Sequence, residues 1–338
     1  MSLRLTIQRR PFETHLRSVA ESLSPSDGHG PSALLVPVVK GNGYGLGRPF
    51  LISTAADLFG TSRKVAVGTI YEAHDVPLGT PVQVLSPLGE IDTIDIPANA
   101  IPTVGNLRDL QIVTRRSASQ STPVTSVVVK LASAMRRFGT SPEKFADLVQ
   151  AIGSEGFIVD SCALHVPLQA QRNSSLVSLN EELAAWLSLI PKCVTVSLSH
   201  VTPSEALDLA RHYADNTFEV RMGTMLWHGD KSFFALHAEV LETHSCVAGD
   251  TAGYHGTSVP GNGTLAVIGA GTTHGVTPLA NGDSPFHFQR KRLHLLEFPY
   301  MHNAIVFVPQ GTPTPQVGEL LDVQRPLTSV SPDFINFV

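Results

Sequence analysis

A lysine at the end of an apolar run is the residue whose type and position most clearly indicate chemistry. Leu34–Val39 is apolar throughout, and Lys40 follows it and opens a loop with glycines at positions 41, 43, 45 and 47. Desolvation at the edge of an apolar core lowers the pKa of an ammonium group, so the amine could act as a Schiff-base nucleophile or a general base near neutral pH. The alternative is a lysine whose charged end simply reaches solvent past the strand.

A nucleotide site is the main competing interpretation of a glycine-rich loop after a strand. The glycines recur at every second position, so the third glycine of G-x-G-x-x-G would have to be Leu46 or Arg48. The phosphate loop G-x-x-x-x-G-K-[ST] is also not matched, because Lys40 precedes the glycines instead of following them. Neither nucleotide fingerprint is met.

The elements that must position Lys40 alternate between strand-like and helical stretches. The expected strands are Leu34–Val39, Val65–Thr69, Val82–Ser86, Ile101–Val104, Ser126–Leu131, Phe157–Val166, Val194–Val201 and Phe218–Met222. The expected helices are Pro11–Leu23, Phe50–Phe59, Ile70–His74, Asn106–Arg115, Pro142–Ile152, Ser175–Leu189 and Ala206–Tyr213. Thr140 and Thr202, each with Pro two or one residues on and Glu three residues on, are expected helix N-caps. The alternation predicts an α/β fold, a TIM-like (β/α)8 barrel, whose active sites lie at the carboxyl ends of the strands.

The pattern of expected elements changes after about Lys231. Five alternating, strand-like pieces separated by Gly, Pro and Asn turns follow without good helical stretches: Ala235–Glu242, Thr264–Ile268, Arg292–Glu297, Ala304–Val308 and Gln316–Leu321. We therefore expect a barrel domain over residues 1–231 and a C-terminal all-β domain over residues 232–338.

The segment around Lys40 resembles a known family. Val38-Val-Lys40-Gly-Asn-Gly-Tyr44-Gly-Leu-Gly47 is similar to the VVKANAYGHG signature of the alanine racemases, which are pyridoxal-phosphate enzymes of fold type III. The resemblance implies that Lys40 forms the internal aldimine and acts as one acid/base, and that Tyr44 helps to hold the phosphate. Gly41 and Gly43 stand where the family usually has alanine.

The resemblance continues at later strand ends. Residues 129–139, VKLASAMRRFG, resemble LKxDTGMxRLG of the family. This implies that Arg137 bonds the phenolic oxygen of the cofactor and that Lys130, which is often carbamylated in the family, neutralises and positions that arginine. Ala132 and Ala134 replace the family's aspartate and glycine.

Three further strand ends fit the same comparison. His165 stands where the family has a histidine that packs on the pyridine ring, and Thr202 falls near a phosphate-binding Asn-Ser pair. Residues 219–229, EVRMGTMLWHG, resemble vRpGixlYG. The resemblance implies that Arg221 donates to the pyridine nitrogen, and that the amides of Gly223 and Thr224 bind the phosphate.

The chain departs from the family where the second acid/base is expected. The family supplies a tyrosine within GYADG from the β domain of the partner subunit, whereas residues 266–275 read AVIGAGTTHG with Ala270 at that place. His274, Tyr254 and His302 are the candidates to replace it. His274 and His302 are the expected second bases, because an imidazole titrates near neutral pH.

The composition of the chain argues against several other classes of protein and partner. With 24 basic and 29 acidic residues the net charge is −5, which argues against a nucleic-acid partner. Cys162, Cys193 and Cys246 are widely spaced, so neither a disulfide framework nor a thiolate metal site is indicated. No apolar signal or membrane segment is evident, and we expect a cytoplasmic protein with no membrane partner and no metal.

Three functions stay open from the sequence. The first is a racemase-like isomerase whose small-molecule substrate is an amino acid, acting as a homodimer with shared active sites. The second is a one-base pyridoxal-phosphate enzyme, a lyase, dehydratase or decarboxylase. The third is a pyridoxal-phosphate-binding protein without turnover.

Overall fold

The computed structural model describes residues 3–25, 28–168 and 179–338, and it divides into two compact units. The barrel unit consists of His15–Gly43 and Gly47–Gly229. The β unit consists of Met1–Thr14, Tyr44–Leu46 and Asp230–Val338. Each unit is described separately.

Parallel strands form the wall of the barrel unit. They are β2 (Ala33–Pro37), β3 (Val65–Val67), β4 (Val82–Val84), β5 (Ala100–Ile101), β6 (Thr103–Val104), β7 (Ser126–Leu131), β8 (Ile158–His165), β9 (Thr195–Ser199) and β10 (Phe218–Met222). One sheet has the order β2-β10-β9-β8-β7-β6, and a second has the order β3-β4-β5.

Two links close these sheets into a ring. A parallel bridge joins Val38 to Ala66, and β5 and β6 are two halves of one strand on either side of Pro102. Proline has no backbone N–H, so the ladder is interrupted there, although the carbonyl of Pro102 still accepts a bond from Val128. The ring has eight strand positions, and the expected (β/α)8 barrel is confirmed.

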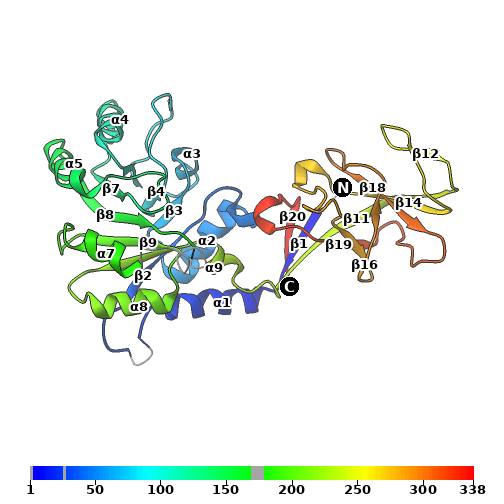
Figure 1. Cartoon of the computed structure of the whole chain (residues 1–338), viewed down its shortest axis with the longest axis horizontal. Helices are drawn as coiled ribbons and strands as arrows, with labels where there is room; N and C mark the ends of the chain where they lie inside the picture. Colours follow the sequence, from blue (N-terminus) through cyan, green and yellow to red (C-terminus); the bar gives the residue numbers. More distant parts are fainter. Residues whose placement is uncertain (1–2, 26–27, 169–178) are drawn as a thin grey trace. The chain divides into compact units, whose positions relative to one another are not determined.

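Helices follow most of the strands and lie outside the wall, as α4, α5, α7 and α8 show in Figure 1. The helices of the chain are α1 (Arg9–Glu21), α2 (Arg48–Phe59), α3 (Ile70–Ala73), α4 (Leu107–Ala118), α5 (Pro142–Ser154), α7 (Leu179–Leu187), α8 (Pro203–His212) and α9 (Thr224–His228). The first four residues of the expected helix 175–189 lie outside the described residues.

One of the two expected helix caps is confirmed and the other is wrong. Thr202 caps α8 in a capping box, because its side chain accepts from the amide of Glu205 while the Glu205 carboxylate accepts from the amide of Thr202. The N-cap of α5 is Ser141, not Thr140, and its side chain makes no capping bond. Pro142 at the first helical position fixes φ for the helix, which moves the start one residue along.

The β unit is built on one long strand, β11 (Phe234–Cys246), which pairs with β1, β14 and β19. The other strands are β1 (Leu3–Ile7), β12 (Thr251–Ala252), β13 (Thr257–Ser258), β14 (Gly263–Ile268), β15 (Phe286–Phe288), β16 (Lys291–Arg292), β17 (His294–Leu295), β18 (Ala304–Pro309), β19 (Leu320–Val323) and β20 (Phe334–Phe337). The short helices are η2 (Thr272–His274) and η3 (Leu327–Ser329). β1 is an addition to the sequence analysis, and its three buried side chains alternate with half-buried ones as expected of a strand covered on one face.

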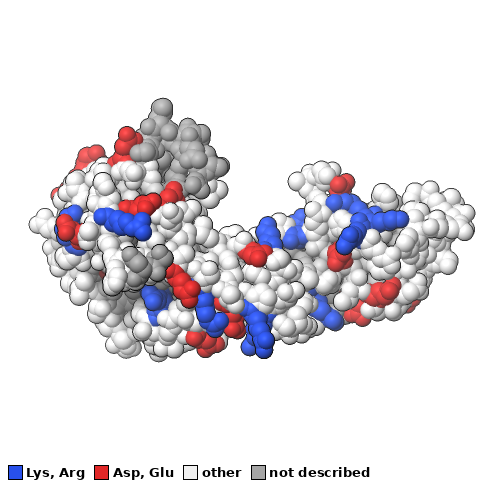
Figure 2. All heavy atoms as spheres, turned by 90° about the horizontal axis from the view of Figure 1, so that it is seen from below, with Lys and Arg blue, Asp and Glu red and all other residues white. Residues whose placement is uncertain are grey.

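None of the helices in the described part of the chain is long and apolar enough to cross a bilayer. Over the face of the molecule in Figure 2, basic and acidic side chains are interspersed.

Candidate functional site

Five basic side chains lie near the carboxyl ends of the barrel strands and interact electrostatically with one another. Lys40 follows β2, Lys130 is in β7, Arg137 follows β7, His165 ends β8 and Arg221 is in β10. Besides burial, the charges of Arg137 and Arg221 lower the pKa values of Lys40, Lys130 and His165, and Lys130 also lowers that of His165. We call these five residues the mouth cluster. It unites residues that the sequence analysis took from four separate motifs.

The Lys40 loop is held by backbone bonds and by close approach. The amide of Val39 donates to the carbonyl of Ala66 at 2.8 Å, and the amide of Gly43 donates to the carbonyl of Lys40 at 3.2 Å. Gly43 has a φ of +62°, and a Cβ there would lie 2.4 Å from the backbone nitrogen of Arg48. This position therefore requires glycine, and the turn after Lys40 is fixed by it.

Partial desolvation lowers the pKa of Lys40, the charges of Arg137 and Arg221 lower it further, and Glu72 partly offsets them. Glu72 itself accepts a bond from the amide of Gly68 at 2.7 Å. The Cβ of Lys40 lies 3.4 Å from the place that a side chain on Gly68 would occupy, so the lysine stem fits against a glycine of the next strand end. A lowered pKa favours the neutral, nucleophilic amine.

Lys130 is almost completely buried among like charges. Burial lowers its pKa to about 6, with Arg221 and Arg137 acting in the same direction. At neutral pH this amine is therefore largely uncharged.

Arg221 is buried in the wall of the barrel by three hydrogen bonds. Its guanidinium donates to the Ser197 side chain at 2.8 Å, to the Ser197 carbonyl at 3.2 Å and to the Leu164 carbonyl at 3.0 Å. Burial lowers its pKa to about 10 and Glu219 raises it, so the group stays cationic at neutral pH. Its orientation is set by the neighbouring strands β8 and β9.

His165 is a neutral imidazole in a fixed orientation. Its Nδ1 lies 2.6 Å from the hydroxyl of Ser199, and its ring centroid is 4.5 Å from that of His200. Burial lowers its pKa to about 2, helped by the charges of Lys130 and Arg221. Ser199 is a positioning residue that the sequence analysis did not identify; its place at the end of the neighbouring strand is the signal that could have found it.

The expected phosphate-binding residues lie at two helix starts. Thr202 exchanges both bonds of its capping box with Glu205, as described above. Gly223 is the N-cap of α9, and Thr224 is its first residue. The indole of Trp227 in α9 donates to the carbonyl of Val38 at 2.7 Å, which ties this helix to the end of the strand that precedes Lys40.

Tyr44 is described with the β unit. It is buried, has a φ of +57°, and lies in the short η1 turn (Gly43–Gly45). The next residue, Gly45, has its backbone so close to the carbonyl of Leu327 that a Cβ would lie 2.2 Å from it. The loop that contains Tyr44 is thus held by close packing against Leu327.

The opposite end of the barrel holds charges that the sequence analysis missed. Lys64, just before β3, lies 2.6 Å from Asp160 and 3.0 Å from the buried Glu219. These carboxylates raise the pKa of Lys64 in spite of its burial. The three residues are far apart in the sequence, so only the strand register brings them together.

His274 in the β unit has both ring nitrogens engaged. The amide of Gly271 donates to Nδ1 at 3.1 Å, so that nitrogen is unprotonated. Nε2 lies 3.3 Å from the carboxylate of Asp333 and is the nitrogen that carries the proton. The ring is buried, and it supports the turn 271–275.

His302 differs from His274 in having an open nitrogen. The hydroxyl of Thr273 donates to the carbonyl of Met301 at 2.6 Å, so its oxygen accepts from His302 Nδ1 at 3.2 Å. This pattern leaves Nε2 of the exposed His302 as an unprotonated acceptor. The rings of His274 and His302 are 6.1 Å apart.

The other residues considered for the second base have different surroundings. Tyr254 is 85% exposed and stacks on Tyr300 at 4.4 Å, and its amide donates to Glu297 at 2.8 Å. Ala270 is completely buried. Among the described residues, no group of three or more His, Cys, Asp or Glu side chains could hold a metal ion.

The mouth cluster fits an anionic cofactor with an aldehyde. Glu72 raises the pKa of Lys40 and Glu219 raises that of Arg221, in each case against the larger effect of burial. Lys130 and His165 lose their charge mainly because they are buried, and their basic neighbours act in the same direction. An anionic group would relieve this repulsion, and an amine with a lowered pKa beside it could bind a carbonyl carbon.

The chain is similar to known proteins over most of its length. The sequence profile of the alanine racemase N-terminal domain matches residues 15–231. Alanine racemase 2 of Clostridium acetobutylicum is 22% identical over 267 residues, which are 73% of this chain and 66% of that protein, just under two thirds of its length.

Solved structures share the fold over both units. The alanine racemase of Bartonella henselae with covalently bound pyridoxal phosphate has a TM-score of 0.73 at 20% identity, with all of both chains covered. The histidine racemase of Leuconostoc mesenteroides has a TM-score of 0.69 at 16% identity, covering 100% of this chain and 97% of that one.

Proposed function

Because the chain belongs to the alanine racemase family, we propose that it is a pyridoxal-phosphate-dependent amino-acid racemase, an isomerase that interconverts the two enantiomers of an amino acid. The observation that supports this most strongly is the mouth cluster, in which burial and the charges of Arg137 and Arg221 lower the pKa values of Lys40, Lys130 and His165. Such an arrangement is costly unless an anionic ligand offsets it.

Pyridoxal phosphate would be held by residues at the strand ends. We assign Lys40 to the covalent bond and the following residues to binding: Tyr44, Arg137, His165, Thr202, Arg221, Gly223 and Thr224. When bound, the cofactor withdraws electrons from the α-carbon of an amino acid and so acidifies its C–H bond.

Lys40 is the base for one face of the substrate. Its lowered pKa favours the neutral amine, which is the form that accepts the α-proton. Arg221 stays charged and is held rigidly by Ser197 and Leu164, so it orients whatever hydrogen-bond acceptor lies in front of it.

The second base would come from the β unit of another copy in a homodimer. His302 and His274 are the two candidates, and the hydrogen bonds favour His302. The described residues form no hydrogen bond with Nε2 of the exposed His302, whereas one ring nitrogen of His274 is engaged by the amide of Gly271 and the other by Asp333. In this proposal Thr273 holds His302 in the tautomer that a base requires.

We propose that the functional division is a barrel over residues 1–231 and a β domain over 232–338, with the N-terminal strand β1 completing the sheet of the latter. We also propose a cytoplasmic location. It is supported by Cys162, Cys193 and Cys246, which are all free thiols.

The test is the fate of the α-proton in D2O. Each enantiomer of a panel of amino acids is incubated with the protein and pyridoxal phosphate, and inversion is followed by chiral chromatography and deuterium uptake by mass spectrometry. We expect both, with loss of both in Lys40→Ala. His302→Gln should retain exchange from one enantiomer and lose inversion, whereas the matched variant His274→Gln should keep inversion.

Three results would count against the proposal. Exchange without inversion in the wild type would mean that only one base acts. Release of ammonia or CO2 would indicate a lyase, dehydratase or decarboxylase. The absence of exchange with every amino acid would leave a binding protein without turnover.

A further inference from the structure

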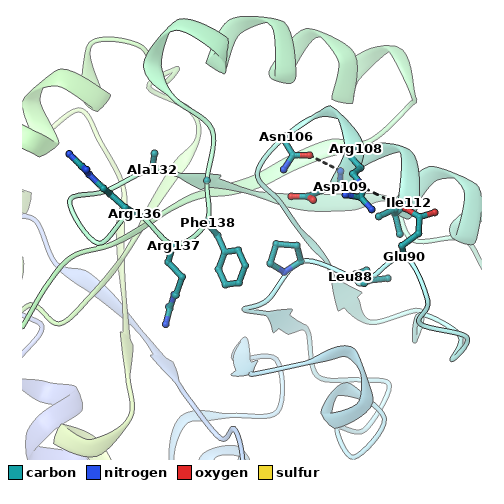
Figure 3. Close-up of a pocket in the computed structure, with 13 residues that line it drawn as sticks. Leu88, Glu90, Asn106, Arg108, Asp109, Ile112, Ala132, Arg136, Arg137 and Phe138 are labelled. Carbon is teal, nitrogen blue, oxygen red and sulfur yellow. Dashed lines mark hydrogen bonds and ion pairs between the residues drawn. The ribbon is translucent and has the colours of Figure 1, made fainter.

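A cavity of about 620 Å³ opens beside Arg137 in the barrel unit. It is formed by the loops after β4, β6 and β7, and all of its lining residues are described. Figure 3 shows Phe138 between Arg137 on one side and Asn106, Arg108, Asp109 and Glu90 on the other; Arg136 points away from that second group. The cavity thus leads from a member of the mouth cluster to a polar wall.

The carboxylates of the far wall are already engaged. Glu90 accepts from Arg115 at 2.7 Å, and this bond holds its pKa below the usual range. Asp109 accepts from the amide of Gly105 at 2.8 Å, and burial raises its pKa. Neither carboxylate is therefore available as a strong partner for a cationic ligand.

The cations of the cavity are less completely engaged. Arg108 meets Glu90 through Nε at 3.6 Å, a longer contact than the 2.7 Å bond that Arg115 donates to the same carboxylate. Arg137 lies 5.7 Å from the ring centroid of Phe138 and forms no salt bridge with the described carboxylates. Since Arg115 pairs with Glu90 from outside the cavity, the lining presents excess positive charge.

The cavity is also far larger than the side chain of alanine. A methyl group occupies on the order of 30 Å³, about the share of one water molecule. The volume beside Arg137 is therefore sufficient for a side chain of several heavy atoms, with Leu88, Ile112 and Phe138 available to contact its carbon atoms.

We propose that this cavity receives the side chain of an acidic amino-acid substrate such as glutamate, free or at the end of a larger conjugate, and that Arg108 binds the distal carboxylate. The inference rests on the proposed function for the reaction at the α-carbon. The binding of the side chain is supported by the cavity itself. Arg108 is then a specificity-determining residue, and Phe138 forms the wall along which the side chain extends.

The test separates binding from turnover. Glutarate, a dicarboxylate without an amino group, and its neutral diamide are titrated by calorimetry into the protein loaded with pyridoxal phosphate. We expect the diamide to bind at least about 10-fold more weakly, and Arg108→Gln to weaken glutarate binding roughly 10- to 100-fold, as for loss of a hydrogen bond between charged groups. Arg115→Gln, which also removes a partner of Glu90 but lies outside the cavity, is the matched control and should bind glutarate as the wild type does.

The racemisation panel completes the test. We expect kcat/KM for glutamate to exceed that for glutamine and alanine at least about 10-fold, and to fall with Arg108→Gln mainly through KM. Arg108-dependent glutarate binding without racemisation would overturn the proposed function and leave this inference standing. Racemisation with no preference for glutamate, or glutarate binding that Arg108→Gln does not weaken, would overturn the inference and leave the proposed function standing.

Discussion

The two ends of the barrel each contain a lysine that is largely removed from solvent, and the charged neighbours of the two lysines shift their pKa values in opposite directions. At the amino end of the strands, Lys64 lies between Asp160 and Glu219 and its pKa is raised. At the carboxyl end, burial lowers the pKa of Lys130 to about 6, and the charges of Arg221 and Arg137 act in the same direction. The same side chain thus has carboxylate partners at one end and basic neighbours at the other.

This difference separates a stabilising role from a ligand-binding role. A buried cation that exists to hold the fold has its counter-charges built into neighbouring strands, as Lys64 has. A group of basic side chains without such partners reduces stability, and the fold keeps it where a ligand supplies the missing charge. The contrast favours the mouth cluster as the ligand-binding site. It favours the ion pairs around Lys64 as contacts that stabilise the barrel.

The largest effect is expected from Lys64→Met. The change leaves the buried Glu219 and the neighbouring Asp160 without their cation, so the free energy of unfolding should fall by about 3–5 kcal/mol. Urea unfolding followed by circular dichroism measures it. Lys144→Met on the exposed side of α5 is the control and should stay within about 0.5 kcal/mol. Equal effects of the two variants would show that the paired end is not what stabilises the barrel.

Replacement of lysine by methionine in the mouth cluster should change the free energy of unfolding in the opposite direction. In the cofactor-free protein Lys130→Met removes a buried amine from among like charges, and we expect a gain of roughly 2–4 kcal/mol at pH 7. The unfolded chain keeps the proton of Lys130 up to about pH 10.5 and the folded chain loses it above about pH 6, so wild-type stability rises with pH across that window. Lys130→Met should lack this rise. A destabilised variant with an unchanged pH dependence would contradict the comparison.

A smaller effect is expected below neutral pH from His165. The unfolded chain takes up a proton below about pH 6.5, whereas folded His165 stays neutral down to about pH 2, so the free energy of unfolding falls as the pH falls through this range. At pH 5 the loss should be about 2 kcal/mol relative to pH 7. His165→Asn should flatten the profile measured by urea unfolding. Retention of the full slope would mean that another group titrates.

The barrel could be predicted well because its signals are local. Strands such as β2 and β3 are short apolar runs, and the start of α8 carries its own cap at Thr202, so eight strand positions follow from the sequence. The misplaced cap at Thr140 shows the limit of such signals, because Thr140 and Ser141 both qualify and the position of Pro142 decides between them. β1 was missed because its partners, β11 and β20, lie more than 200 residues away.

The site could be predicted only in part. Residue types and motif order identified the five members of the mouth cluster, and their mutual electrostatic effects agree with that grouping. The pairing of Lys64 with Glu219, the bond from Ser199 to His165 and the different tautomers of His274 and His302 depend on strand register and turn geometry. No single segment of the sequence contains that information.

Mapping of the lysine that carries pyridoxal phosphate tests the central claim most directly. The protein is incubated with the cofactor near pH 7.5, reduced with borohydride, digested and analysed by mass spectrometry. Lys130 is the internal rival, since burial lowers its pKa to about 6 and its amine is largely neutral at this pH. We predict a single reduced adduct on Lys40, lost in Lys40→Ala without transfer to another residue. An adduct on Lys130 instead, or no adduct on any lysine, would contradict the assignment of the mouth cluster as the cofactor site.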